Sequence, residues 1–439
     1  MTPAAPPPRA PVERAGAERA PGGPGQPGGS GGRPDIGKLE TAWREEAPRI
    51  LGAVARTTGD LLLAEDAVQE AFARALEEAA RGRVPTNPAA WITTVARRVA
   101  LDALRREQTA NRAAPALAAE LARTERATSD DAGEGMVFTG DERLELILLV
   151  AHPDLSAEAR VELALRFVCG LPTARIAEVF LVPEATMAAR LTRAKKRIHS
   201  AGVRFALDDP RDVADRMSDA LATIYLLYTV GHLTADRALR ADAVALARDA
   251  HRIARTDESA GLLALLLFTE ARQATRLTAD DEFALLRDAD RSRWDVPLMT
   301  EAEALATAAL AGGGRYALQA GIAGLHAIAR TWQATDWPAI VRLYDGLVRQ
   351  WPSPAARLGR VVALGHSPDA GPEVALSALA ADPELFRGPA AAQAYAARAE
   401  LLRLSGRSAE AVHDLRRAVE AAGDERTARS LARLLAAVE

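Results

Sequence analysis

The sequence has a single cysteine and no long apolar run. Cys169 cannot form an internal disulfide, and one thiol excludes a thiolate-rich metal site. Its apolar neighbours in RFVCG predict a buried thiol rather than a reactive one. No apolar run approaches the roughly 20 residues of a membrane span, and no charged start precedes an apolar signal segment. We therefore expect a soluble, cytoplasmic protein with no membrane partner.

Neither sign of charge predominates, and the sequence also lacks catalytic patterns. The 55 basic and 59 acidic residues leave a net charge of −4, so any nucleic-acid contact must come from local patches. The seven histidines have no metal-ligand spacing. RDADRSRWD suggests a calcium loop starting at Asp288, but the chain has Arg293 and Met299 where such a loop needs glycine and glutamate. We expect Arg291 and Arg293 to pair with nearby acids instead. No catalytic constellation is present. We expect no enzyme activity, no metal and no cofactor.

Composition and breaks in the pattern predict an all-α fold in several parts. Aromatic content is 4%, whereas Ala and Leu are abundant. The expected parts are a disordered Pro/Gly/Ala-rich tail (1–35), a folded block (36–107), a linker (108–140), a second block (141–205) and a helical remainder (206–439).

The second block contains a helical hairpin at residues 173–200. Its first helix has apolar residues at Ile176, Val179 and Phe180, and Pro183 suits the start of a second helix. In that helix Met187, Leu191, Ala194 and Ile198 recur at the spacing of one buried face. The opposite face is basic, with Arg190, Arg193, Lys195, Lys196 and Arg197. This pattern is typical of a DNA-binding helix-turn-helix, although an ordinary hairpin with a solvated basic face would look similar.

The first block is polarised in charge. Residues 40–78 carry nine acids and four bases, whereas residues 81–106 carry six bases and one acid. The acidic half contains the amphipathic helix AEDAVQEAFARAL, with a predicted apolar stripe of Val68, Phe72, Ala75 and Leu76. A loop, RGRVPTNP, then leads to a basic helix at residues 89–107. The basic loop and helix could contact DNA or simply be solvated.

The helical remainder contains breaks at Gly231, at residues 312–314 (a turn without a phosphate-loop lysine), and at Pro338, Pro354 and Pro383. Residues 392–423 match the tetratricopeptide pattern of a helix pair about 34 residues long. One such repeat cannot bury its own apolar face, so we expect a tetratricopeptide-like solenoid. Such a solenoid could receive a protein or peptide partner.

Taken together, the two blocks resemble an extracytoplasmic-function sigma factor of bacterial RNA polymerase. AEDAVQEAFARAL resembles the region-two helix that docks on polymerase, and NPAAWITTVARRVALDALRRE resembles the helix facing the minus-ten element. The hairpin block resembles region four, which reads the minus-thirty-five element. LLRDADRSRWDVPLMTEAEAL and the tail resemble a subgroup with a tetratricopeptide-like extension. Where the family often has Arg-Asn this chain has Arg97-Arg98, so no role of that Asn is carried over.

The resemblance implies a sigma factor that binds core RNA polymerase and promoter DNA, without catalytic residues. We expect base contacts from the start of the recognition helix and phosphate contacts further along. The implied minus-thirty-five readers are Glu184, Thr186, Ala189, Arg190, Arg193, Lys195, Lys196 and Arg197. The implied minus-ten side comprises Arg81, Arg83, Trp91, Arg97, Arg98, Arg105 and Arg106. The implied polymerase-binding residues are Glu65, Asp66, Gln69 and Glu70.

An alternative function is a stand-alone helix-turn-helix regulator whose solenoid senses a ligand. A simple repressor has no use for the first block, which favours the sigma factor. The solenoid is expected to regulate the sigma part within the same chain.

Overall fold

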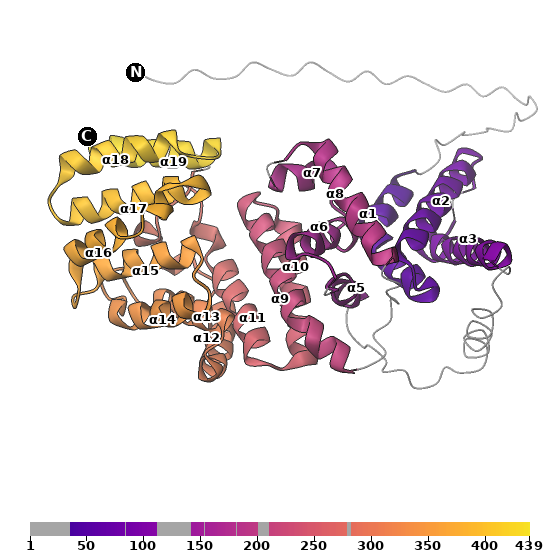
Figure 1. The fold of residues 1–439 in the computed structure, drawn as a ribbon, viewed down its shortest axis with the longest axis horizontal. Coiled ribbons are helices and arrows are strands. Elements are labelled where there is room, and N and C mark those ends of the chain that lie inside the picture. The colour runs from indigo at the N-terminus through magenta and orange to yellow at the C-terminus, as the bar shows by residue number, and fades with distance from the viewer. Residues whose placement is uncertain are drawn as a thin grey trace, which may run out of the picture.

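A computed structural model describes residues 36–83, 85–111, 142–152, 154–180, 182–200, 210–278 and 282–439. Within these ranges the fold is all-α, as predicted, with one isolated β-bridge between Leu277 and Phe283 (Figure 1). The predicted tail and most of the predicted linker lie outside the described residues. No described helix is long and apolar enough to cross a bilayer.

The first block is a three-helix unit of α1 (Ile36–Thr58), α2 (Leu61–Ala80) and α3 (Pro88–Asn111). Asp60 caps α2 by accepting hydrogen bonds from the backbone N–H groups of Leu62 (2.8 Å) and Leu63 (3.3 Å). Val68, Phe72 and Ala75 are buried, as predicted, but Leu76 is 48% exposed. The buried stripe of α2 continues through small alanines to Ala79, and Leu76 projects beside it.

The second block contains α5 (Glu142–Val150), α6 (Ala157–Phe167), α7 (Thr173–Val179) and α8 (Glu184–Ser200). The predicted helix-turn-helix is confirmed as α7 and α8, with Ile176, Met187, Leu191, Ala194 and Ile198 buried. The apolar residues of α5 are all buried, including the run 146–150, because this helix packs against α1, α6, α9 and α10.

The C-terminal part is a curved stack of helices (Figure 1). Its members are α9 (Pro210–Leu233), α10 (Arg237–Ala254), α11 (Asp257–Ala271), α12 (Val296–Ala309), α13 (Arg315–Ile328), α14 (Trp337–Gln350), α15 (Pro354–His366), α16 (Gly371–Ala380), α17 (Ala391–Leu404), α18 (Ser408–Glu420) and α19 (Glu425–Ala436). Each helix packs mainly on its neighbours in sequence, as expected of a solenoid. The predicted helix pair at residues 392–423 is α17 and α18.

Two sequence expectations for this part are wrong. Gly231 does not break a helix but lies inside α9, where a Cβ atom would be 2.9 Å from Cγ of Arg240. Its missing side chain lets α10 approach closely. Among the described residues, Arg291 pairs with no acid. Its Nη1 atom donates to the carbonyl oxygens of His326 (2.6 Å) and Ala329, and its guanidinium stacks on Trp294.

One hydrophobic core connects the two blocks to the start of the stack. It runs without interruption from Ile50 in α1 to Ala327 in α13, whereas α14–α19 have smaller separate clusters. The second block therefore lies between the first block and α9–α10 (Figure 1). This placement fixes how the candidate functional surfaces face one another.

Candidate polymerase and promoter interface

The recognition helix α8 exposes a mixed polar and basic face. Its buried stripe turns Glu184, Thr186 and Ala189 outwards, together with the basic residues Arg193, Lys196 and Arg197. The helix begins with Glu184 exposed in its first turn, where a carboxylate is favourable. Six of the eight residues predicted to read the minus-thirty-five element are thus open to solvent. Arg190 and Lys195 are half-buried.

Arg190 is held by a buried acid on α6. Its Nη1 atom donates to Oε1 of Glu162 at 3.1 Å, and the Glu162 side chain is only 3% exposed. Burial raises the pKa of Glu162, whereas the bond from Arg190 lowers it. Glu162 was not predicted from the sequence, although a lone acid inside the apolar stretch VELAL is a usable signal. Arg190 therefore supports the hairpin in addition to its predicted role on DNA.

Arg190→Ala is expected to destabilise the chain by about 1–3 kcal/mol, because the Glu162 carboxylate would stay buried without its partner. A raised pKa means that the folded state binds the proton more tightly than the unfolded state. The loss of stability should therefore be smallest below about pH 4.5. It should grow as the pH rises through the pKa of Glu162 in the folded chain. Urea unfolding across this range measures it. Adding Glu162→Gln should remove the pH dependence, and an unchanged pH dependence would contradict the assignment.

Lys195 connects the recognition helix to the predicted polymerase-binding helix. Its Nζ atom lies 2.8 Å from Oε2 of Glu65 on α2, with side-chain exposures of 21% and 13%. Nζ also lies 5.9 Å from the centre of the Phe167 ring. Of the predicted polymerase-binding residues, Asp66, Gln69 and Glu70 remain exposed. The Lys195–Glu65 ion pair thus engages one residue from each of two predicted functional surfaces.

A cavity of about 830 Å³ lies beside this ion pair, between α1 and α2 of the first block and α6 of the second. Its lining is mostly apolar and includes Leu51, Phe72, Leu76 and Phe167. Cys169 also lines it, and burial raises the pKa of its thiol to about 12, so the thiol stays protonated at neutral pH. The two blocks are therefore in contact without being fully packed here.

The predicted minus-ten side divides into paired and unpaired cations. Arg81 and Arg83, at the end of α2, each pair with Glu78 at 2.7 Å and lower its pKa. On α3, Trp91 packs against the core, and Arg105 lies 3.6 Å from Asp102. The other predicted cations, Arg97, Arg98 and Arg106, are exposed, and no ion pair is found for them in the described part of the chain. They give α3 an uncompensated basic surface.

The second block is also ion-paired to the C-terminal part. Nη1 of Arg143 on α5 lies 2.6 Å from Oδ1 of Asp242 on α10. Arg160 on α6 pairs with Asp219 on α9, and both arginine side chains are mostly buried. Arg216 donates to the carbonyl of Leu148 at 3.5 Å. These contacts, which the sequence did not reveal, fix α5 and α6 against α9 and α10.

Three family models match parts of the chain. The model "Sigma-70 region 2" matches residues 42–110, and "Sigma-70, region 4" matches residues 145–198. Residues 216–310 match a family of unknown function, DUF6596. No solved structure matches the chain.

Two curated relatives are similar to parts of the chain. The chain is 37% identical over 353 residues to "Uncharacterized protein R00370" of Rhizobium meliloti, covering 78% of this chain and 82% of that protein. It is 27% identical over 165 residues to "Probable ECF RNA polymerase sigma factor SigI" of Mycobacterium tuberculosis, covering 38% of this chain and 56% of that protein. With sigma-70 regions 2 and 4 in order and a helical part behind them, the chain has the domain organisation of an extracytoplasmic-function sigma factor with a C-terminal helical extension.

Proposed function

We propose that the chain binds core RNA polymerase through the exposed face of α2 and reads promoter DNA through α3 and α8. The observation that carries this proposal is the pair of sigma-region matches on helices with opposite exposed charges. The α2 face offers carboxylates at Asp66 and Glu70, whereas α3 and α8 offer exposed cations. Cations on α3 and α8 can bind phosphates, and the exposed start of α8 can reach base edges.

We also propose that the observed arrangement is a closed state. Elements at minus ten and minus thirty-five are 25 base pairs apart, which is about 85 Å of duplex at 3.4 Å per base pair. Here α8 touches α2, and α2 packs along α3, whose 24 residues span about 36 Å. The two reading surfaces are then too close together to engage both elements at once. Promoter binding would require the second block to leave the first.

We propose that the C-terminal part controls that opening. α9 and α10 hold α5 and α6 through the Arg143–Asp242 and Arg160–Asp219 pairs. In this proposal the solenoid regulates the sigma part in cis and receives the partner that triggers opening. A ligand can shift such an equilibrium only by binding the open state more tightly than the closed one.

Co-purification of the full chain with core polymerase tests the main proposal. Polymerase should be retained, and run-off transcription from a randomised promoter library should enrich a two-part element. Tight binding to an operator without any affinity for core polymerase would instead support the stand-alone regulator.

Arg193→Ala and Lys196→Ala are expected to weaken binding of the holoenzyme to promoter DNA and leave binding to core polymerase intact. Both side chains are exposed, and neither pairs with an acid in the described part of the chain. Each lost phosphate contact should reduce the slope of log affinity against log salt by roughly 0.9. A salt titration of promoter binding measures this slope. An unchanged slope would place α8 away from the DNA backbone.

A further inference from the structure

The concave side of the solenoid already contains an extended piece of this chain. Between α11 and α12, residues 282–285 run without helical structure and end in a short 3-10 turn, Leu286–Asp288. The last helix, α19, holds this piece by its backbone. The N–H of Phe283 donates to Oγ of Ser430 at 2.9 Å, and the carbonyl of Phe283 accepts from Nη2 of Arg433 at 3.0 Å. Two side chains thus satisfy both backbone groups of one residue, as a peptide-binding groove would.

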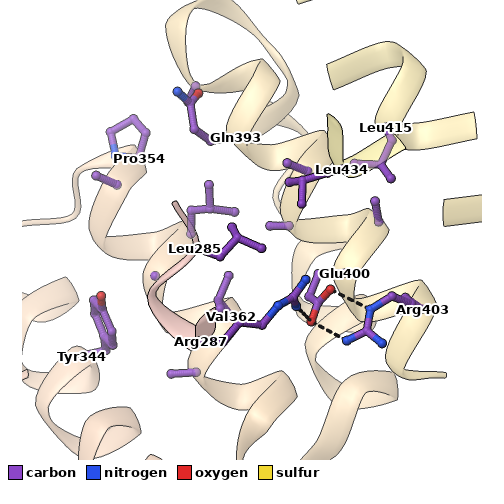
Figure 2. A pocket seen from close by; sticks show the side chains of 18 of the residues that line it. Leu285, Arg287, Tyr344, Pro354, Val362, Gln393, Glu400, Arg403, Leu415 and Leu434 are labelled. Atoms are coloured by element: carbon purple, nitrogen blue, oxygen red, sulfur yellow. Dashed lines mark hydrogen bonds and ion pairs between the residues drawn. The ribbon is translucent and has the colours of Figure 1, made fainter. Parts of the chain in front are cut away.

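The side chains of this segment, residues 282–288, also meet specific partners. The Phe283 ring lies 4.9 Å below the guanidinium of Arg276. Leu285 points into the groove, and Nη1 of Arg287 lies 2.6 Å from Oε1 of Glu400 on α17 (Figure 2). Arg403 binds the same carboxylate at 2.8 Å, and these two cations lower its pKa. The side chains of Leu285 and Arg287 therefore lie in the groove, whereas the Phe283 ring lies at its edge, between the guanidinium groups of Arg276 and Arg426.

This segment does not fill the groove. A cavity of about 1270 Å³ continues from Leu285 and Arg287 along α15, α17 and α19. That volume exceeds the 300–1,000 Å³ typical of small-molecule sites. Its lining includes the small residues Ala396 and Ala397, and Gly359, whose missing side chain makes room for the hydroxyl of Tyr344. Gln393, on the same face of α17, is exposed and has no hydrogen-bond partner within the described residues (Figure 2).

We propose that this groove binds an extended peptide of a partner protein, and that residues 282–288 are a tethered stand-in for it. The partner peptide would carry the same pattern, aromatic-x-aliphatic-x-arginine, with its arginine on Glu400. The tethered segment has the advantage of high effective concentration. A partner peptide overcomes it by making further contacts in the unfilled cavity. The inference rests on the proposed role of the solenoid as receiver of a partner, and its test uses neither polymerase nor DNA.

A labelled peptide of residues 282–289, EFALLRDA, is the probe. It should bind the full wild-type chain weakly, because the chain's own segment occupies the anchors. The double variant Phe283→Ala with Arg287→Ala loosens that segment and should bind the probe at least about tenfold more tightly. Adding Glu400→Gln to the double variant should weaken its affinity for the probe by about tenfold, because the charge-assisted hydrogen bond to the arginine of the probe is lost. Fluorescence anisotropy measures each affinity.

Two controls make the result specific to the groove. Glu384→Gln removes another groove carboxylate, whose one described ion pair is the exposed one with Arg387, and should leave probe binding unchanged. A second probe carries leucine in place of its arginine. It should bind the double variant as weakly as the original probe binds the double variant with Glu400→Gln added. Circular dichroism checks that each variant is folded.

Three outcomes would overturn the inference. These are no binding to the loosened variant, binding that ignores Glu400, and dimerisation of the loosened variant in light scattering with loss of the site for the probe. The last would show that a second copy of the chain occupies the groove. Failure here would leave core-polymerase binding unaffected, so it can be distinguished from failure of the proposed sigma function.

Discussion

Replacing Asp219 and Asp242 by arginine is expected to raise promoter-specific transcription by the purified chain about tenfold, or about 1.4 kcal/mol. Both acids belong to the C-terminal part and lie outside every predicted DNA or polymerase contact. Each now pairs with an arginine of the second block, Arg160 and Arg143 respectively. Reversal turns two attractions into repulsions across the α5–α6 and α9–α10 contact. Because both aspartates are about 40% exposed, solvent screening keeps each effect modest.

The gain should be reversible by charge swapping. Arg143→Asp combined with Asp242→Arg recreates the ion pair in the opposite sense and should restore low activity. Glu301→Arg is the matched control, because Glu301 is about as exposed as the two aspartates and its pair with Arg248 lies wholly within the C-terminal part. In vitro transcription with saturating core polymerase measures the effect. Unchanged or reduced activity in a folded double variant would mean that α9 and α10 do not hold the chain closed.

Gly261→Ala is expected to destabilise the C-terminal part by about 3 kcal/mol, the upper end of ordinary overpacking. Gly261 lies where α11 crosses α13. An added Cβ atom would be 2.4 Å from the backbone nitrogen of Ala317 and 2.7 Å from the carbonyl carbon of Tyr316. Backbone atoms cannot move aside as a flexible side chain can. The same crossing buries the Glu258 carboxylate, which accepts from the N–H of Tyr316 at 3.1 Å.

Thermal unfolding followed by circular dichroism should show a transition about 10 °C lower in this variant. Gly423→Ala is the control, since a Cβ atom there meets nothing within 4 Å, and it should unfold like the wild type. Equal melting of the two variants would show that α11 and α13 separate at little cost.

Helix periodicity was sufficient to predict the recognition hairpin, because each buried residue of α8 follows from its neighbours within the same helix. Leu76 was wrongly placed in the core of the first block. The buried stripe of α2 continues through Ala75 and Ala79, one position away from Leu76, and small alanines are easily overlooked as core residues. Gly231 was misread because glycine marks close packing as well as helix ends. These errors are local, and each has a local cause.

Long-range pairing could not be predicted in this way. Lys195 and Glu65 are 130 residues apart, and each belongs to a surface expected to face another molecule. A sequence gives the charge of each surface but does not show that the two surfaces meet. The segment at residues 282–288 is similar, since its partners Glu400 and Ser430 lie more than a hundred residues downstream.

The uninterrupted core from Ile50 to Ala327 has a consequence for how this chain can evolve. A stop codon just before α9 would leave Leu146, Leu148 and Val150 of α5 without the helices that cover one side of them. Simple gene shortening at that point would therefore expose these apolar side chains to water. Any descendant that discards the stack must first replace these leucines and valines with polar residues, so the two parts are inherited together.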